Sequence, residues 1–327
     1  MLLAWPVYGQ SLEFASLGDF RLESGATIRD CRLAYRTAGK LDAARSNVIL
    51  FPTWFSGTTQ QLIDGFIGAG KLADTNKYYV IAVDALGNGV SCSPSNSKAQ
   101  PRLKFPQFTI RDMVRSQKEL LSRLNIPHLY AVMGISMGGM QTFEWATLFP
   151  DFMEKAVPIA GTPRQTSSDL LLWNAELSAI ESDKDWKDGN YTEPPALKTL
   201  ARIHSFALTT PQFRARETKP GEFANFLTEA EKSPARFDAV NWVRQMQAML
   251  SHDIGHGQPL ESAASRIKAK MFVVVAAQDH MVNPATAVEL SRLLGVTAMI
   301  SQSDCGHMVT SCEGPKIVEE VHRFLSR

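Results

Sequence analysis

The chain has 327 residues, of which 44% are hydrophobic and 20% are charged, and its formal net charge is +1. This composition is typical of a globular protein, and the length allows one large α/β domain or two smaller ones. The near-neutral charge and the lack of a Lys/Arg-rich run argue against nucleic acid as a partner, and no apolar run reaches the roughly 18 residues that span a bilayer.

The first ten residues, MLLAWPVYGQ, resemble the end of a secretory signal, with a short apolar run, a proline and then small residues. The basic segment that opens such a signal is missing and the apolar run is short, so these residues also fit a frayed terminus. The location therefore stays open between the cytoplasm and a secreted or periplasmic space.

Apolar runs alternate with amphipathic segments along most of the chain. Residues 12–37 predict two or three antiparallel strands with a turn at Ser24-Gly25. The apolar runs predict buried strands at 47–51, 77–84, 129–134, 155–160, 271–277 and 297–301. The amphipathic runs predict helices at 109–124, 137–149, 284–294 and 315–325. Because strand and helix alternate, we expect an α/β fold with a mostly parallel sheet and helices on both faces.

One long segment breaks this alternation. Residues 162–265 contain no clear strand, and they hold Trp173, Trp186, Trp242 and several methionines between proline-rich breaks. A stretch of about a hundred residues is too long for a loop. The sequence therefore predicts a helical lid or cap at 162–265, inserted into a core made of residues 1–161 and 266–327.

Ser136 lies at the junction of a predicted strand and a predicted helix, in the segment Gly134-Ile135-Ser136-Met137-Gly138. In this context G-x-S-x-G is typical of a nucleophile elbow, a sharp turn that lifts the serine Oγ out of the sheet. The glycines on either side must lack a Cβ because a side chain there would collide with the turn. The alternative is a glycine-rich turn that binds phosphate or only packs tightly, but the strand–helix context favours a nucleophile.

A nucleophilic serine needs a base and an orienting acid, which follow it in the order Ser, acid, His in this kind of fold. Three histidines follow the insertion. His322 falls within a predicted helix among charged residues, so we expect it on a solvated face. His280 directly follows Asp279, the candidate acid discussed below, and is expected to point elsewhere. His307 lies in the loop SDCGHMVTS after the last strand, so we assign it as general base and then general acid.

Asp279 is the candidate orienting acid. It follows the strand at 271–277, at the carboxyl edge where open α/β sheets place ligands and catalysts. Asp304 is the runner-up, although it lies only three residues before His307. Asp84 also ends a strand, but we expect it to brace the loop at 86–88.

An oxyanion formed at the serine needs two backbone N–H donors. Met137, the residue after the nucleophile, is predicted to supply one. The other is expected from the loop PTWFSG after the strand at 47–51, where Phe55 is our choice and Trp54 the alternative.

Two further groups of residues could be chemical. His252, Asp253 and His256 in SHDIGHG have a spacing that a metal ion could use, but no further ligand is evident and we predict no metal site. Arg202, in the predicted lid, could meet an anionic substrate or could be an ordinary arginine on a helix surface.

The four cysteines are Cys31, Cys92, Cys305 and Cys312, and they form no C-x-x-C pair, which argues against a zinc ribbon or a thioredoxin-like site. In a core of this size we expect free buried thiols. If the N-terminus is a signal remnant, the protein meets an oxidising space, and Cys305 and Cys312 could then bridge around His307.

Five stretches together resemble the homoserine O-acetyltransferase family of α/β-hydrolase folds: YRTAGKLD, DALGNGVSCSPSN, FPQFTIRDMVRSQKELL, GISMGGMQTFEWA and HDIGHG. They match in order and spacing over nearly the whole chain. The resemblance implies an α/β-hydrolase fold, a serine acyl-enzyme formed from acetyl-CoA, a helical lid over a deep tunnel and often a homodimer built through that lid. It implies Ser136 as nucleophile, Asp279 as acid, His307 as base, and Phe55 and Met137 as oxyanion donors.

The acceptor site departs from this family. Members that use homoserine carry an Asp directly after the catalytic His, where it meets the substrate's amino group, and this chain has Met308. The family's oxyanion loop HALTG reads PTWFSG, and Thr210 stands where the lid of the family has a tyrosine. Trp54 and Met308 are therefore expected to make the substrate pocket apolar.

The sequence as a whole predicts a serine acyl-transfer enzyme for a small-molecule acyl substrate, either an ester hydrolase or an O-acyltransferase. No bound cofactor is implied, and acetyl-CoA or another acyl donor would be a substrate. One alternative is a homoserine O-acetyltransferase with a rearranged pocket. Another, of a different class, is a catalytically silent binding protein on a hydrolase fold.

Overall fold

The computed structural model describes residues 11–232 and 237–327, so residues 1–10, expected to be either a signal remnant or a frayed terminus, lie outside the described residues. Within them, nine strands form one sheet in the order β1-β2-β6-β3-β7-β8-β10-β11, with β9 paired to β8. The strands are β1 (Glu13–Arg21), β2 (Thr27–Ala38), β3 (Val48–Pro52), β6 (Tyr79–Val83), β7 (Leu129–Ile135), β8 (Met153–Ile159), β9 (Lys270–Met271), β10 (Val274–Ala276) and β11 (Met299–Ser301). A separate short pair is formed by β4 (Ile67–Gly68) and β5 (Ala73–Asp74).

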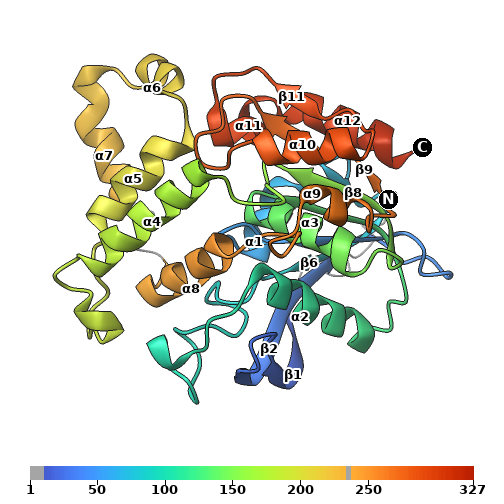
Figure 1. The fold of residues 1–327 in the computed structure, drawn as a ribbon, viewed down its shortest axis with the longest axis horizontal. Helices are drawn as coiled ribbons and strands as arrows, with labels where there is room; N and C mark the ends of the chain where they lie inside the picture. Colours follow the sequence, from blue (N-terminus) through green and yellow to red (C-terminus); the bar gives the residue numbers. More distant parts are fainter. Residues whose placement is uncertain (1–10, 233–236) are drawn as a thin grey trace, which may run out of the picture.

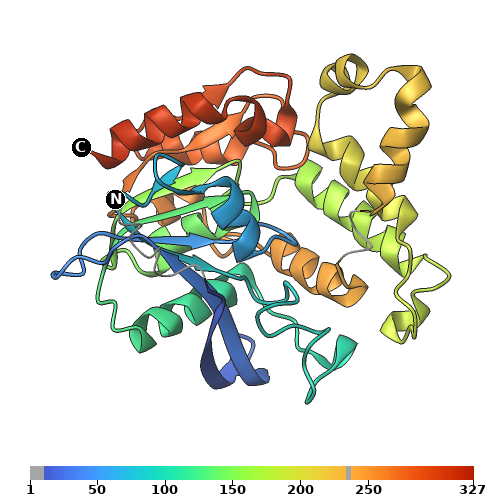
Figure 2. The ribbon, with the colours of Figure 1, turned by 180° about the vertical axis from the view of Figure 1, so that it is seen from behind.

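The sheet is mostly parallel, as predicted. Every pairing from β6 onward in this order is parallel, through β3, β7, β8, β10 and β11. The pairings of β1 with β2 and of β2 with β6 are antiparallel. The blue β1–β2 pair extends from one edge of the sheet beyond the helices (Figure 2). The strand predicted at 271–277 is divided into β9 and β10, and both pair with β8.

Helices cover both faces of the sheet, which confirms the predicted layers (Figure 1). They are α1 (Thr59–Gly65), α2 (Ile110–Arg123), α3 (Met137–Leu148), α10 (Ala285–Leu293), α11 (Val309–Cys312) and α12 (Gly314–Leu325). The apolar residues of α2, α3 and α10 pack on one face, and those of α1 and α12 on the other. Helix α2 begins where Thr109 and Asp112 cap each other's backbone N–H groups, a local signal that fixes its first turn.

We call residues 162–265 the cap segment. Its helices are α4 (Ser167–Glu181), α5 (Lys198–Leu208), α6 (Pro211–Glu217), α7 (Phe223–Lys232), α8 (Ala239–Leu250) and α9 (Leu260–Ala264). Its described residues contain no strand, only an isolated β-bridge between Arg164 and Asp253. Helices α4 to α7 stand beside the sheet and its helices in Figure 1, whereas α9 packs against α10.

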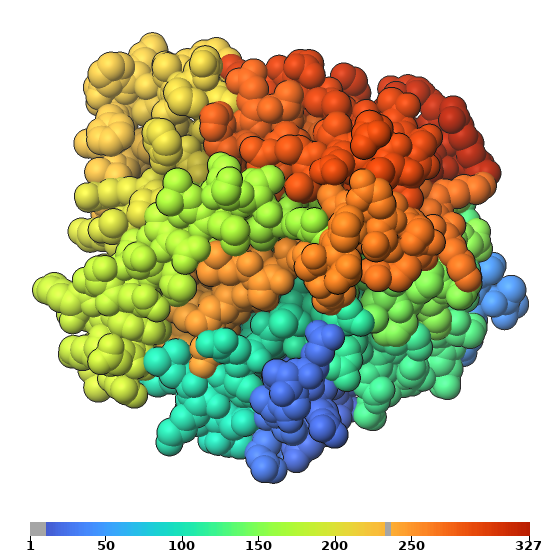
Figure 3. Space-filling view, in the orientation of Figure 1, coloured from blue at the N-terminus to red at the C-terminus, as the bar shows by residue number. Residues whose placement is uncertain are grey.

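The cap segment meets the C-terminal part of the chain, and the two surfaces adjoin in the space-filling view (Figure 3). The Thr210 hydroxyl donates a hydrogen bond to the backbone carbonyl of Asp304 at 2.6 Å, and Arg216 pairs with the Asp304 carboxylate. These contacts join the start of α6 to the loop that precedes His307. None of the helices in the two described ranges is long and apolar enough to cross a membrane.

The cysteines correct one expectation. The structure pairs Cys31 with Cys92 and Cys305 with Cys312, with Cα–Cα separations of 5.3 and 6.4 Å, so the predicted free thiols are wrong. Cys31 lies in β2 and Cys92 in the loop after β6, and these two segments are neighbours because β2 pairs with β6. The second disulfide encloses the short loop that contains His307.

Candidate active site

Ser136 occupies the turn between β7 and α3 with a strained backbone. Its φ of 57° and ψ of −121° lie in a region that side chains with a Cβ rarely adopt. A Cβ on Gly134 would lie 2.1 Å from the carbonyl oxygen of Gly138, and one on Gly138 would lie 2.7 Å from the carbonyl oxygen of Pro52. Both glycines are therefore required by the close approach of backbone to backbone at this elbow.

The three predicted triad residues meet in one hydrogen-bonded chain. His307 Nε2 lies 2.9 Å from Ser136 Oγ, and His307 Nδ1 lies 2.7 Å from Asp279 Oδ2. The other Asp279 oxygen accepts the backbone N–H groups of Met281 and Val282, each at 2.9 Å. These contacts fix the carboxylate, which in turn orients the imidazole so that Nε2 faces the serine.

The fold explains how residues so distant in sequence come together. Ser136 follows β7, Asp279 follows β10 and His307 follows β11, and all three strands run parallel in one sheet. Their carboxyl ends therefore lie at the same edge. The three side chains are nearly enclosed, since Ser136, Asp279 and His307 expose 8%, 6% and 8% of their surface.

Three backbone N–H groups, those of Met137, Phe55 and Trp54, lack a protein acceptor among the described residues. Met137 is the first residue of α3, so its N–H has no partner within the helix. In the part of the chain that the structure describes, the N–H of Phe55 donates to no protein group either, and the same holds for Trp54. The structure thus leaves both residues of the loop after β3 as candidates for the second oxyanion donor.

The loop after β3 is held against α3 and the cap segment. Gln141 of α3 donates its side-chain amide to the Thr53 carbonyl at 3.0 Å. Gln245 of α8 accepts the Ser56 N–H at 2.9 Å and donates to the Leu86 carbonyl at 2.9 Å. Its single amide therefore ties this loop to the loop after β6. The sequence did not predict this contact, because one glutamine within a helix forms no recognisable motif.

A cavity of about 300 Å³ opens at Ser136 and His307. Its other lining residues are Trp54, Phe55, Ser56, Phe66, Ile135, Trp173, His204, Leu208, Met281, Met308, Thr310 and Ser311. Trp54 and Met308, the residues expected at the substrate pocket, both line it. Among the described residues that line it there is no Asp, Glu, Lys or Arg.

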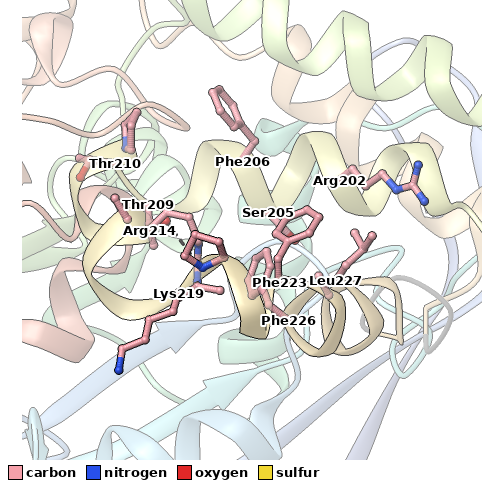
Figure 4. Close-up of a pocket in the computed structure, with 15 residues that line it drawn as sticks. Arg202, Ser205, Phe206, Thr209, Thr210, Arg214, Lys219, Phe223, Phe226 and Leu227 are labelled. Carbon is pink, nitrogen blue, oxygen red and sulfur yellow. Dashed lines mark hydrogen bonds between the residues drawn. The ribbon is translucent and has the colours of Figure 1, made fainter.

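Arg202 does not line this cavity. Its guanidinium binds Glu231 at 2.7 Å, and it borders a separate cavity of about 880 Å³ between α5, α6 and α7 (Figure 4). The runner-up acid Asp304 is also elsewhere, because its carboxylate pairs with Arg216. Asp84 braces its loop as predicted, since it accepts hydrogen bonds from Asn88 at 2.7 Å and from the Thr59 hydroxyl at 2.7 Å.

The SHDIGHG residues do not converge on one point. His252 donates Nε2–H to the Thr162 carbonyl at 3.0 Å, and burial lowers its pKa to about 4. Asp253 binds Arg164 at 2.8 Å, and His256 contacts Arg111. Among residues 11–232 and 237–327, no group of three or more His, Cys, Asp or Glu side chains could hold a metal ion.

Sequence reasoning also missed a second histidine in the cavity. His204 of α5 lines the cavity, and its Nδ1 lies 3.1 Å from the carboxylate of Glu176 in α4. The only signal in the sequence is a histidine in a predicted lid, and the chain order Ser, acid, His places the triad base after that lid.

A mostly parallel sheet between two layers of helices, with a serine at a strand–helix elbow, defines the class of enzymes with the α/β-hydrolase fold. The chain belongs to this family, because the family model described as alpha/beta hydrolase fold matches residues 47–310.

Named relatives include both esterases and acetyltransferases. The chain is 34% identical to the "Probable esterase" of Corynebacterium glutamicum over 90% of this chain and 89% of that protein. It is 33% identical to the homoserine O-acetyltransferase of Trichormus variabilis, over 83% of this chain and 81% of that protein. Its fold matches the crystal structure of an acetylester hydrolase from Corynebacterium glutamicum with a TM-score of 0.90 at 30% identity, over 97% and 96% of the two chains. The resemblance found in the sequence motifs is thereby confirmed.

Proposed function

We propose that the protein hydrolyses small acyl esters, transferring the acyl group first to Ser136 and then to water. The observation that carries this proposal is a complete Ser136–His307–Asp279 hydrogen-bonded chain that opens into a small cavity without charged lining residues. The three hydrogen-bonded residues supply a nucleophile and a base, and the cavity suits a compact, largely apolar ester.

The reaction has two matched halves. Ser136 Oγ attacks the ester carbonyl carbon while His307 Nε2 takes the hydroxyl proton, and the carbonyl oxygen becomes an oxyanion that faces the N–H groups of Met137 and Phe55. The imidazolium, stabilised by Asp279, then donates its proton to the leaving alcohol, which departs as the acyl-enzyme forms. Water then attacks the acyl carbon while His307 takes its proton. His307 returns that proton to Ser136 Oγ as the acyl bond breaks, and the carboxylic acid leaves. Loss of one oxyanion donor costs about 3 kcal/mol of transition-state stabilisation.

The lining of the cavity favours hydrolysis over transfer to homoserine. Homoserine is a zwitterion, and a desolvated ammonium group without a carboxylate partner costs several kcal/mol. The residue after His307 is Met308, and none of the described lining residues carries a carboxylate. The homoserine O-acetyltransferase function, which the similarity to such enzymes favours, is therefore the second candidate.

A direct experiment separates these candidates. The purified protein is given p-nitrophenyl acetate or acetyl-CoA, each with and without homoserine, and the release of p-nitrophenol or CoA is measured. We expect ester hydrolysis and no appreciable stimulation by homoserine. Met308→Asp should raise, and not lower, the stimulation by homoserine. A large, saturable stimulation of the wild-type protein would restore the transferase. No turnover and no labelling of Ser136 by a fluorophosphonate would support a silent binding protein.

We also propose that the cap segment acts as a lid and as the surface of a homodimer. Trp173 of α4 together with His204 and Leu208 of α5 line the cavity, so the cap segment controls what reaches Ser136. Phe206 and Phe223 expose 77% and 54% of their surface beside the apolar cavity shown in Figure 4. Light scattering after size exclusion tests the dimer: Phe206→Glu combined with Phe223→Glu should give a monomer, and a wild-type monomer would contradict the proposal.

A further inference from the structure

Glu176 and His204 form a pair that the mechanism above does not use. Glu176 is fully buried in α4, and its two carboxylate oxygens lie 3.1 and 3.3 Å from His204 Nδ1. Within the described residues, its side chain has no other hydrogen-bond or ion-pair partner. A buried carboxylate is costly unless it is hydrogen-bonded. An Nδ1–H group on His204 that donates a hydrogen bond to Glu176 satisfies this need.

This contact leaves Nε2 as the free nitrogen of His204. The ring is also held by aromatic neighbours, with ring centroids at 5.3 Å for Trp242 and 6.2 Å for Phe55. In the part of the chain that the structure describes, Nε2 meets no protein donor or acceptor. Among the described residues, His204 therefore adds an imidazole with one unpartnered nitrogen to the lining of a mostly apolar cavity.

The position of His204 marks the alcohol side of the ester. His307 hands its proton to the leaving oxygen, so the alcohol must lie on the side of His307. Met308 and Ser311 follow His307 in the chain and line both the cavity at Ser136 and an adjoining cavity of about 340 Å³. His204 and Leu208 also line both cavities. An alcohol group that extends from Ser136 past Met308 would therefore meet His204.

We propose that His204 determines specificity for the alcohol part of the ester, and that preferred substrates carry a hydroxyl group on that alcohol. A hydroxyl can donate to a neutral Nε2 and accept from a protonated one, so it suits either state of the ring. An alkyl group at the same place would bury Nε2 without a partner, which costs binding energy. Glu176 is a positioning residue that acts through His204. The inference rests on the proposed ester hydrolysis.

The test compares 2-hydroxyethyl acetate with propyl acetate, which have the same number of non-hydrogen atoms. Each kcat/KM is divided by the rate constant for hydrolysis by hydroxide, so that intrinsic reactivity cancels. We expect the wild-type protein to prefer the hydroxyl ester by at least about tenfold, since a site that binds a substrate hydroxyl discriminates against its absence. His204→Phe should bring the ratio close to one. His204→Gln, which keeps a polar group, should retain part of the preference.

Glu176→Gln keeps the shape of Glu176 but removes its charge and its hold on His204 Nδ1, so it should reduce the preference for the hydroxyl ester. The matched control is His128→Phe, because His128 forms a surface pair with Glu154 at 3.6 Å and should leave the ratio unchanged. Circular dichroism and fluorophosphonate labelling of Ser136 show whether each variant is folded. If the wild-type and His204→Phe proteins showed the same ratio of kcat/KM for the two esters, the inference would be overturned. If His204→Phe does not fold, the same comparison is made between wild type and the two Gln variants. Failure of both esters and of Ser136 labelling would instead overturn the proposed hydrolysis.

Discussion

The backbone strain at Ser136 can be measured with two substitutions that both remove the hydroxyl group of this proposed nucleophile. Ser136→Ala keeps a Cβ at φ 57° and ψ −121°, whereas Ser136→Gly relieves the clash. A residue held in such a sparsely populated region costs about 1–3 kcal/mol. Glycine loses about 0.5–1 kcal/mol more than alanine when the chain is ordered. We therefore expect Ser136→Gly to be more stable than Ser136→Ala by about 1 kcal/mol.

Ser178 provides the matched control, because it is an exposed residue inside α4 with ordinary helical surroundings. There glycine should be less stable than alanine by about 1 kcal/mol, so the sign of the difference reverses between the two sites. The assay is urea unfolding followed by circular dichroism, with all four variants measured at one pH. If Ser136→Gly were less stable than Ser136→Ala by the same amount as at Ser178, the elbow would store no strain.

Four further predictions follow from the site and the core. Ser136→Ala and His307→Ala should each lower kcat for p-nitrophenyl acetate by about as much as the double variant, because the two residues act as a unit, and additive losses in steady-state kinetics would contradict this. Burial raises the pKa of Glu144 to about 7, so its contribution to stability is complete below pH 4.5 and lost as pH rises through 7. Urea unfolding of Glu144→Gln and wild type should therefore diverge between pH 5 and 8, by up to about 3 kcal/mol in favour of the variant. The lowered pKa of His252 acts in the opposite sense, because the stability that neutral His252 contributes is present above pH 6.5 and is lost as pH falls through 4. His252→Gln should therefore make unfolding less sensitive to acid. An unchanged dependence of the unfolding free energy on pH would refute the buried, neutral state of His252. Mass spectrometry of the unreduced, alkylated protein should find no free thiol at the four cysteines, and alkylation of any of them would contradict the pairing.

The parts of the site that follow strand ends could be predicted from the sequence. Ser136, Asp279 and His307 each come after a recognisable apolar strand, and parallel strands bring their carboxyl ends to one edge. The steric demand for Gly134 and Gly138 is local and was equally readable. Nothing local distinguishes Phe55 from Trp54, however, because the oxyanion donor is a backbone N–H that every residue of the loop possesses.

The parts that depend on helix packing could not be predicted. Glu176 and His204 are 28 residues apart on two helices, and their contact depends on how α4 packs against α5. Arg202 lies two residues before His204 on α5, yet its side chain binds Glu231 rather than reaching the cavity. The periodicity of a helix shows which residues share a face, but it does not show which neighbour that face will meet. The pairing of Cys31 with Cys92 was hidden for the same reason, because it depends on strand order.

Gln245 limits how freely this enzyme could be rebuilt. The cap segment would be the natural part to exchange with a relative in order to change substrate range. However, Gln245 of α8 accepts the Ser56 N–H within the loop that carries both candidate oxyanion donors. A chimera that replaces all of residues 162–265 would therefore alter the catalytic machinery together with the substrate pocket, unless the donor segment brings an equivalent amide. Helices α5 to α7 can diverge without that penalty. Variation among natural relatives should accordingly concentrate in those helices, while α8 changes together with the core.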